Sequence, residues 1–148
     1  MVRIAAAVCI TAILTGTNTF RDKQQKYKRV AEAYLQKEGS LKSMFRSKGM
    51  DYNTFRMCVV IYKKEQRLKV FIKGDGGEPY SCLKDYAICF SSGELGPKRQ
   101  QGDFQVPEGF YYINRFNPVS SFHLSLGINY PNASDRTLGK SHPGGDIF

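Results

Sequence analysis

Two runs of strand-forming residues near the middle of this 148-residue chain constrain its fold more than any other feature. Residues 56–63 and 68–73 are rich in Val, Ile, Phe and Tyr, which favour β-strands. The polar stretch Lys64 to Arg67 separates them and has the length of a turn between paired strands. The sequence therefore predicts a β-hairpin at this point.

Further strand patterns follow the hairpin. A turn cluster at residues 74–79 leads into residues 80–89, which we interpret as one or two strands bent near Lys84 and Asp85. Later candidate strands are 109–114 and 123–128, with one more starting in 144–148. Strands separated by turn signals predict an α+β domain that is mainly β, built as a β-sandwich or an open barrel.

The segment before the hairpin has a helical period instead. Its apolar side chains recur at i, i+3, i+4, i+7 and i+8, the pattern of one helix face: Tyr27, Val30, Ala31, Tyr34 and Leu35. Gly39 is the expected end of this helix, and a second short helix through Phe45 is expected to stop at Gly49. We therefore predict a helical N-terminal segment over residues 20–50, with one or two helices, followed by a domain over residues 51–148.

The first residues have the pattern of an export signal. Arg3 is followed by an apolar run from Ile4 to Leu14 and then by small polar residues. A run of that length is too short to cross a bilayer as a helix, so no stable membrane span is expected, and it fits a signal peptide over residues 1–19. The alternative is a buried N-terminal helix. Export would place the protein in the periplasm or cell envelope.

The chain is basic, with a formal net charge of +9. Residues 21–48 hold nine basic and three acidic side chains, so this stretch alone contributes 9 − 3 = +6. A basic surface favours anionic partners, which are nucleic acid in the cytoplasm or anionic envelope polymers after export. A solvated helix face is the commoner explanation, and we expect no nucleic-acid partner because the two predicted helices lack a third supporting helix.

Cysteine and histidine show no metal-ligand spacing. Cys58, Cys82 and Cys89 follow the signal region, and none lies in a CxxC or CxxH motif, so no metal is expected. Glycine-rich stretches match no nucleotide-binding motif, so no cofactor is expected either. A Cys89 and His123 pair is an alternative nucleophile and base, although each residue falls in a predicted strand and a structural role is the simpler interpretation.

Four sequence blocks occur in a recognisable order. They read SGELGPK at 92–98, GDFQVPEGFY at 102–111, LSLGINYPN at 124–132 with Asp135 and Arg136 after it, and GGDIF at 144–148. Together they resemble the YkuD-type L,D-transpeptidase family, and within it the YafK-like subgroup of murein-processing proteins. Val106 stands where that family usually has threonine. The resemblance covers roughly residues 55–148 and implies an L,D-transpeptidase-like fold for that region.

The same resemblance implies a reaction in which a cysteine thiolate attacks a peptidoglycan stem peptide, with a histidine as base. In the family both side chains lie in motifs that follow the GGDIF-like strand. The resemblance therefore implies that the chain is truncated before its catalytic His/Cys motif, lacks the C-terminal part of the domain, and contains no catalytic residue of its own. His142 precedes that strand and does not stand at the family's histidine position.

A substrate-facing cleft is expected around residues 129–136. Tyr130 offers a flat apolar ring with a polar tip, and Asn132 and Arg136 can bind peptide carbonyl or carboxylate groups. A simple turn is an equal alternative for Asn-Tyr-Pro-Asn. The predicted cleft residues are Tyr130, Asn132, Asp135, Arg136, Gly144 and Gly145.

Three functions remain open on the sequence. The first is a cell-wall enzyme acting on peptidoglycan stem peptides by cysteine acyl transfer, or by amide hydrolysis that releases wall-anchored lipoprotein as in the YafK-like subgroup. The second is a non-catalytic module that binds the cell wall. The third is a nucleic-acid-binding protein, which would stay in the cytoplasm and bind in a salt-sensitive way.

Overall fold

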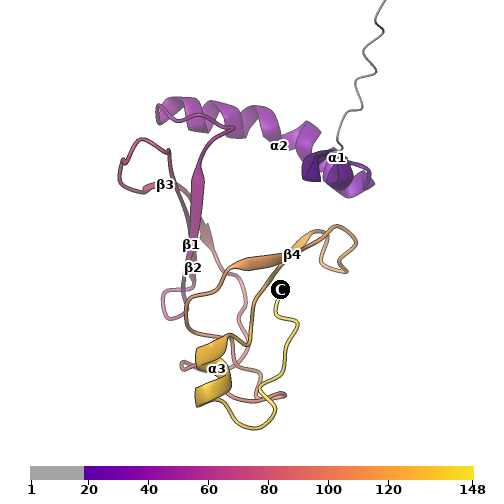
Figure 1. The fold of residues 1–148 in the computed structure, drawn as a ribbon, viewed down its shortest axis with the longest axis vertical. Helices are drawn as coiled ribbons and strands as arrows, with labels where there is room; N and C mark the ends of the chain where they lie inside the picture. The colour runs from indigo at the N-terminus through magenta and orange to yellow at the C-terminus, as the bar shows by residue number, and fades with distance from the viewer. Residues whose placement is uncertain (1–18) are drawn as a thin grey trace, which may run out of the picture.

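The computed structural model describes residues 19–148. It consists of helices α1, α2 and α3 and strands β1 to β5, whose course is shown in Figure 1. The predicted signal peptide, apart from Thr19, lies outside the described residues. Within residues 19–148 no helix has both the length and the apolar character needed to cross a membrane.

Two helices precede the strands. α1 (Phe20–Gln25) begins at a capping box, in which the Thr19 hydroxyl accepts from the Asp22 N–H and the Asp22 carboxylate accepts from the Thr19 N–H. α2 (Lys28–Ser47) is a single helix that runs through Gly39, so the predicted break there is wrong. Glu38 pairs with Lys42 across Gly39, one turn further along the helix, and also with Arg21 of α1.

The C-terminal end of α2 packs by its aromatic side chain on the segment that leads into the first sheet. Phe45 is only 2% exposed, and its ring meets Tyr52 and Phe55 edge-on at 5.3 and 4.7 Å between centroids. This anchor explains why the helix continues past Gly39, because the last two turns bring Phe45 onto the two aromatic rings that precede β1.

The predicted hairpin is confirmed. β1 (Arg56–Tyr62) and β2 (Arg67–Lys73) pair antiparallel, and β3 (Ser81–Ala87) pairs with the other edge of β2. The predicted bend in residues 80–89 is a bulge in one strand, because Val70 pairs with Lys84 and Phe71 with Cys82, which leaves Leu83 unpaired.

The second sheet is shorter than predicted. β4 (Ile113–Asn117) and β5 (Ser125–Ile128) pair antiparallel, so β4 starts four residues later than expected and His123 lies in the connecting turn. His123 adopts φ 78°, a left-handed conformation incompatible with the predicted strand. Residues 144–148 form no strand, although the Ile128 N–H donates to the Ile147 carbonyl at 3.0 Å.

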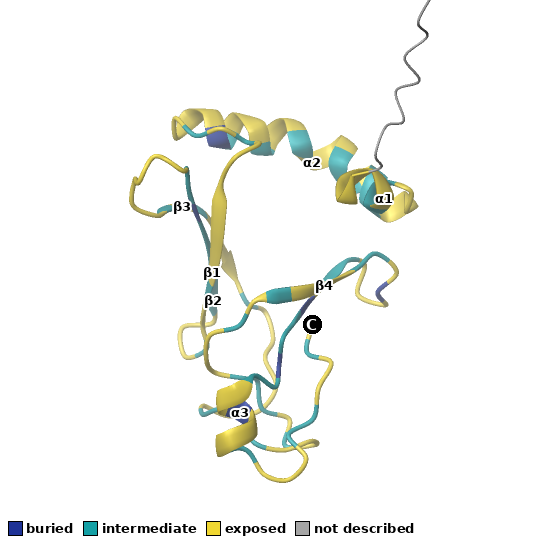
Figure 2. Ribbon diagram, viewed as in Figure 1, coloured by how far each residue is buried: buried dark blue, intermediate teal, exposed yellow. Residues whose placement is uncertain are grey.

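The predicted α+β class is confirmed, with antiparallel strands in two sheets and no closed barrel among the described residues. A third helix, α3 (Ala133–Leu138), was not predicted. The hydrophobic core is small: Phe45, Ile72 and Tyr130 are its buried apolar side chains within residues 19–148. Figure 2 shows that most of the ribbon, including β1, is exposed.

Candidate functional site

A polar pocket lies between the start of β4 and the helix α3. Its volume is about 300 Å³, and it opens to solvent. Its walls come from two segments that are distant in sequence, residues 112–114 and residues 129–136. They meet because the Asn129 N–H donates to the Tyr112 carbonyl at 3.1 Å, next to the pairing of β4 with β5.

Two neighbouring tyrosines, one of which lines the pocket, connect it to the rest of the chain by hydrogen bonds. Tyr130 is buried, and its hydroxyl donates to the Pro143 carbonyl at 3.0 Å. Tyr111 lies beside it, with 6.2 Å between ring centroids, and donates its hydroxyl to Asp135 at 3.0 Å. Burial raises the pKa of both phenols, and the Asp135 carboxylate raises the pKa of Tyr111 further. Both tyrosines therefore stay neutral and act as hydrogen-bond donors.

Asp135 organises the start of α3 rather than the pocket surface. It is 5% exposed, and its carboxylate accepts from the Asn132 N–H at 2.9 Å as well as from Tyr111. In return the Asn132 side chain accepts from the Asp135 N–H at 3.0 Å, which completes a capping box. Both oxygens of the Asp135 carboxylate thus already accept hydrogen bonds from within the chain.

The loop between the first two sequence blocks is fastened by two lysines. Lys98 is buried and bonds Asp103 at 2.7 Å, while Lys63 reaches from the β1–β2 turn to Glu108 at 2.9 Å. Lys63 also donates to the carbonyls of Gly96 and Val106. Lys98, Asp103 and Glu108 of these blocks are therefore used in bonds within the chain, which gives them a structural role.

Asp103 should make the protein sensitive to acid. The hydrogen bond from Lys98 lowers the pKa of this carboxyl well below its usual range, helped by the N–H groups of Arg99, Gln100 and Gln105. A carboxyl with a lowered pKa in the folded state stabilises the fold above its ordinary value of about 4, and that stabilisation disappears as the pH falls below it.

We therefore expect Asp103→Asn to lower the thermal midpoint at pH 7 and to differ less from the parent chain at pH 3. Circular dichroism melts across pH 3–7 measure this. Asp75→Asn is the matched control. Asp75 is exposed, and its ion pair with Arg56 is long, at 3.5 Å, so it should add little to stability at any pH. A pH-independent difference between Asp103→Asn and the parent would contradict the expectation.

The structure brings three of the predicted cleft residues together: Tyr130, Asn132 and Arg136 all line the pocket. Asp135, which precedes Arg136 in α3, is buried and does not line the pocket. Gly144 and Gly145 do not line this pocket; a Cβ on Gly144 would lie 3.5 Å from Gln101 and 3.6 Å from the Lys98 side chain.

Sequence reasoning missed the other wall of the pocket, Tyr112 and Asn114, whereas Asn129 lies within the predicted segment 129–136. Strand alternation contains a signal for the first two, because side chains two residues apart point to the same face of an extended segment. Nothing local links Asn129 to them, since the contact with Tyr112 depends on the pairing of β4 with β5.

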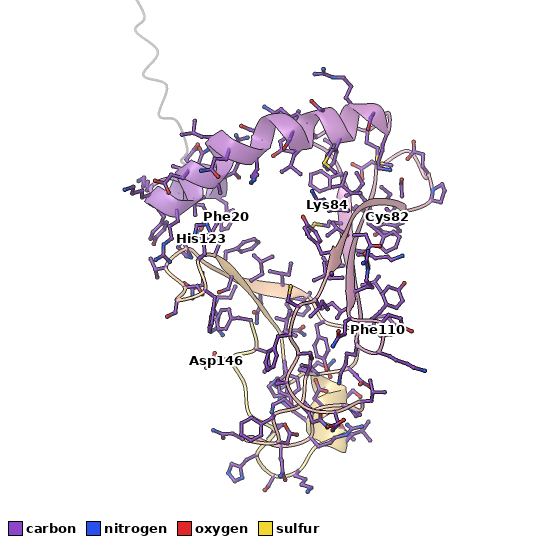
Figure 3. All side chains as sticks on the ribbon, turned by 180° about the vertical axis from the view of Figure 1, so that it is seen from behind. Phe20, Cys82, Lys84, Phe110, His123 and Asp146 are labelled. Carbon is purple, nitrogen blue, oxygen red and sulfur yellow. The ribbon has the colours of Figure 1, made fainter. Side chains whose placement is uncertain are left out.

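The cysteines and histidines do not assemble into a nucleophilic pair. Cys58, Cys82 and Cys89 are free, exposed thiols, and no hydrogen bond in residues 19–148 joins a cysteine to a histidine. Cys89 lies just beyond the end of β3, not in a strand as predicted. Figure 3 shows His123 near Phe20, far from Phe110 beside the pocket. The described part of the chain also contains no group of three or more metal-ligating side chains.

Comparison with known proteins identifies partial relatives. No family model matches the chain. The "Putative L,D-transpeptidase YafK" of Escherichia coli strain K12 is 45% identical to it over 83 residues, which is 55% of this chain and 33% of that protein. The protein of the same name from Escherichia coli O157:H7 matches equally. The chain is a partial homologue of these proteins. It spans about a third of the length of the curated relatives that it matches.

Proposed function

We propose that this chain is part of a cell-wall enzyme of the L,D-transpeptidase type, acting on peptidoglycan stem peptides. The observation that carries the proposal is the 45% identity over 83 residues to proteins named for that activity. The order of the four sequence blocks supports it, as does a pocket formed by residues of the third block. The YkuD-type, YafK-like subgroup and an L,D-transpeptidase-like β-sandwich or open barrel over residues 51–148 belong to the same proposal.

In the proposed reaction a cysteine thiolate forms a thioester with the stem peptide, releases an amine, and passes the acyl group to a second amine or to water. In this proposal that cysteine and its histidine follow Phe148, because the family's motifs for both come after the GGDIF-like segment at 144–148. Residues 19–148 then supply scaffold and a substrate-binding cleft. Export to the periplasm or envelope, directed by residues 1–19, belongs to the same proposal.

Cysteine replacement tests where the nucleophile lies. Deleting the gene is expected to change the stem-peptide products in muropeptide profiles measured by mass spectrometry. Complementation with a gene carrying Cys58→Ala, Cys82→Ala and Cys89→Ala should restore the original profile, because none of these thiols is placed for catalysis. Loss of activity on changing Cys89 alone would assign the nucleophile to this chain and sink that part of the proposal.

A non-catalytic wall-binding module is the second candidate. The pocket favours it, since the pocket is formed within this chain and needs no nucleophile. It predicts that the chain sediments with purified peptidoglycan sacculi while the gene deletion leaves the muropeptide profile unchanged.

A further inference from the structure

The pocket beside α3 contains an arginine with no acidic partner. Arg136 lines the pocket and is exposed. No carboxylate of residues 19–148 lies within ion-pair distance of its guanidinium, whereas Arg21, Arg67 and Arg115 each pair with one at 2.6 to 2.9 Å. Arg136 is also the only charged side chain among the pocket-lining residues. Arg136 therefore puts a positive charge at the pocket surface without an ion-pair partner, while the neighbouring Asp135 carboxylate is buried.

The asparagines of the pocket divide into structural and available groups. Asn132 uses both ends of its amide, accepting from the Asp135 N–H and donating to the Phe110 carbonyl at 3.1 Å. Asn129 accepts from the Tyr112 N–H at 2.8 Å, so its oxygen is occupied and its amide NH2 group is available. Asn114 forms no side-chain hydrogen bond within residues 19–148. Two amides and one guanidinium thus remain to bind a ligand.

These groups stand on a rigid base. Tyr130 and Asp135 are both buried, and the side chain of each is hydrogen-bonded to another part of the chain, so the segment that bears Asn129 and Arg136 is held at both ends. A fixed arrangement of donors loses little entropy when a ligand binds. The half-open pocket is completed by the ring of Tyr112, which is 67% exposed and offers a flat apolar surface.

We infer that this pocket binds the carboxylate end of a short peptide. Arg136 receives the terminal carboxylate, the amides of Asn129 and Asn114 bond the adjacent peptide group, and the last side chain lies against Tyr112. A guanidinium matches a carboxylate through two parallel hydrogen bonds. The volume of about 300 Å³ is at the lower limit for a small-molecule site and fits one or two residues. The identification of the peptide as a stem peptide rests on the proposed function; carboxylate recognition does not.

A glycan is the main competing ligand, because an exposed tyrosine flanked by asparagines also suits a sugar. The guanidinium of Arg136, exposed and without an ion-pair partner, decides between them. A neutral sugar gains little from a guanidinium, whereas a carboxylate gains a charge-assisted bond.

Ligand-observed NMR titration of the 148-residue chain tests the inference. The probes are N-acetyl-L-lysyl-D-alanine, the same peptide with a C-terminal carboxamide, and chitotetraose. We expect the free acid to bind, and both the carboxamide probe and the Arg136→Gln variant to weaken binding by about tenfold or more. Arg136→Lys should retain part of the affinity, since it keeps the charge but loses the two-bond geometry.

Arg46→Gln is the matched control, because Arg46 is an exposed arginine of α2 outside the pocket and should not alter binding. Arg136→Gln should leave the thermal midpoint unchanged, so its effect reports on binding and not on folding. Equal affinity for acid and carboxamide, absence of binding, or chitotetraose binding that Arg136→Gln does not change would each overturn the inference. Muropeptide profiles are independent of these probes, so failure of the proposed enzyme function would be recognised separately.

Discussion

Replacing Ile72 by alanine is expected to lower the free energy of unfolding by about 2–5 kcal/mol, and replacing it by valine by about 0.5–1.5 kcal/mol. Ile72 is 0% exposed and belongs to β2, the central strand of the first sheet. It lies opposite Met57 and Ser81. Because the fold has so few buried apolar side chains, few neighbours can move in to fill a cavity at this position. We therefore expect the loss of unfolding free energy for Ile72→Ala to lie at the upper end of its range.

Urea unfolding followed by circular dichroism at low protein concentration measures the effect. The matched control is Leu35→Ala, which removes a similar side chain that is 87% exposed on α2 and should change stability by less than about 0.5 kcal/mol. Equal losses at Ile72 and Leu35 would show that the first sheet is not the stability centre of the chain.

The hairpin could be predicted from sequence because its signals are local. Two strand-forming runs separated by a short polar stretch determine both the strands and their antiparallel pairing, and the observed register joins Arg56 to Lys73 and Tyr62 to Arg67. The continuous helix through Gly39 could not be predicted in the same way. A glycine favours a helix end locally, but the anchoring of Phe45 on Tyr52 and Phe55 overrides that preference.

In the second sheet and α3, too, local sequence signals and long-range contacts favour different structures. His123 follows a strand-like pattern, yet the Arg29 side chain donates to the carbonyls of Ser120 and His123 and holds that segment in a turn against α2. Asn132 and Asp135 have the spacing of a capping box, a local signal for a helix start in a segment where the sequence analysis predicts a substrate-facing loop or a turn. A residue pattern that suits both a turn and a helix start is resolved only by its tertiary contacts.

The candidate site could be predicted in part. Tyr130, Asn132 and Arg136 were identified from their side-chain chemistry, and they share one pocket. The opposite wall, Tyr112 and Asn114, comes from a strand whose position depends on pairing with β5. Whether a polar residue faces solvent, a ligand or another side chain depends on such long-range contacts, as the burial of Asp135 shows.

Self-association of the 148-residue chain is the second large effect that we expect. One face of the first sheet is apolar across β1 and β2, because paired residues of antiparallel strands share a face. This apolar face consists of Met57, Val59, Ile61, Leu68, Val70 and Ile72, and β3 adds Tyr86 at one end of it beside the polar Lys84 and Ser81. Within it, Met57, Val59 and Ile61 remain 49%, 40% and 53% exposed.

β1 is also an edge strand, so its outer backbone groups are unpaired within the described sheet. An exposed apolar edge strand pairs readily with another chain. We expect sedimentation velocity at micromolar concentration to show dimers or larger species. The double variant Val59→Thr and Ile61→Lys should shift the distribution toward monomer, since a charge on an edge strand opposes pairing.

The matched control is Leu138→Lys, which places the same charge on an exposed apolar residue of α3, outside the apolar face. It should leave the distribution unchanged, which separates the effect of the β1 face from the general effect of added charge on solubility. A monomeric parent chain with a cooperative thermal transition would show that the apolar face is tolerated in water as it stands. Equal dissociation by Leu138→Lys would instead place the association on net charge, not on β1.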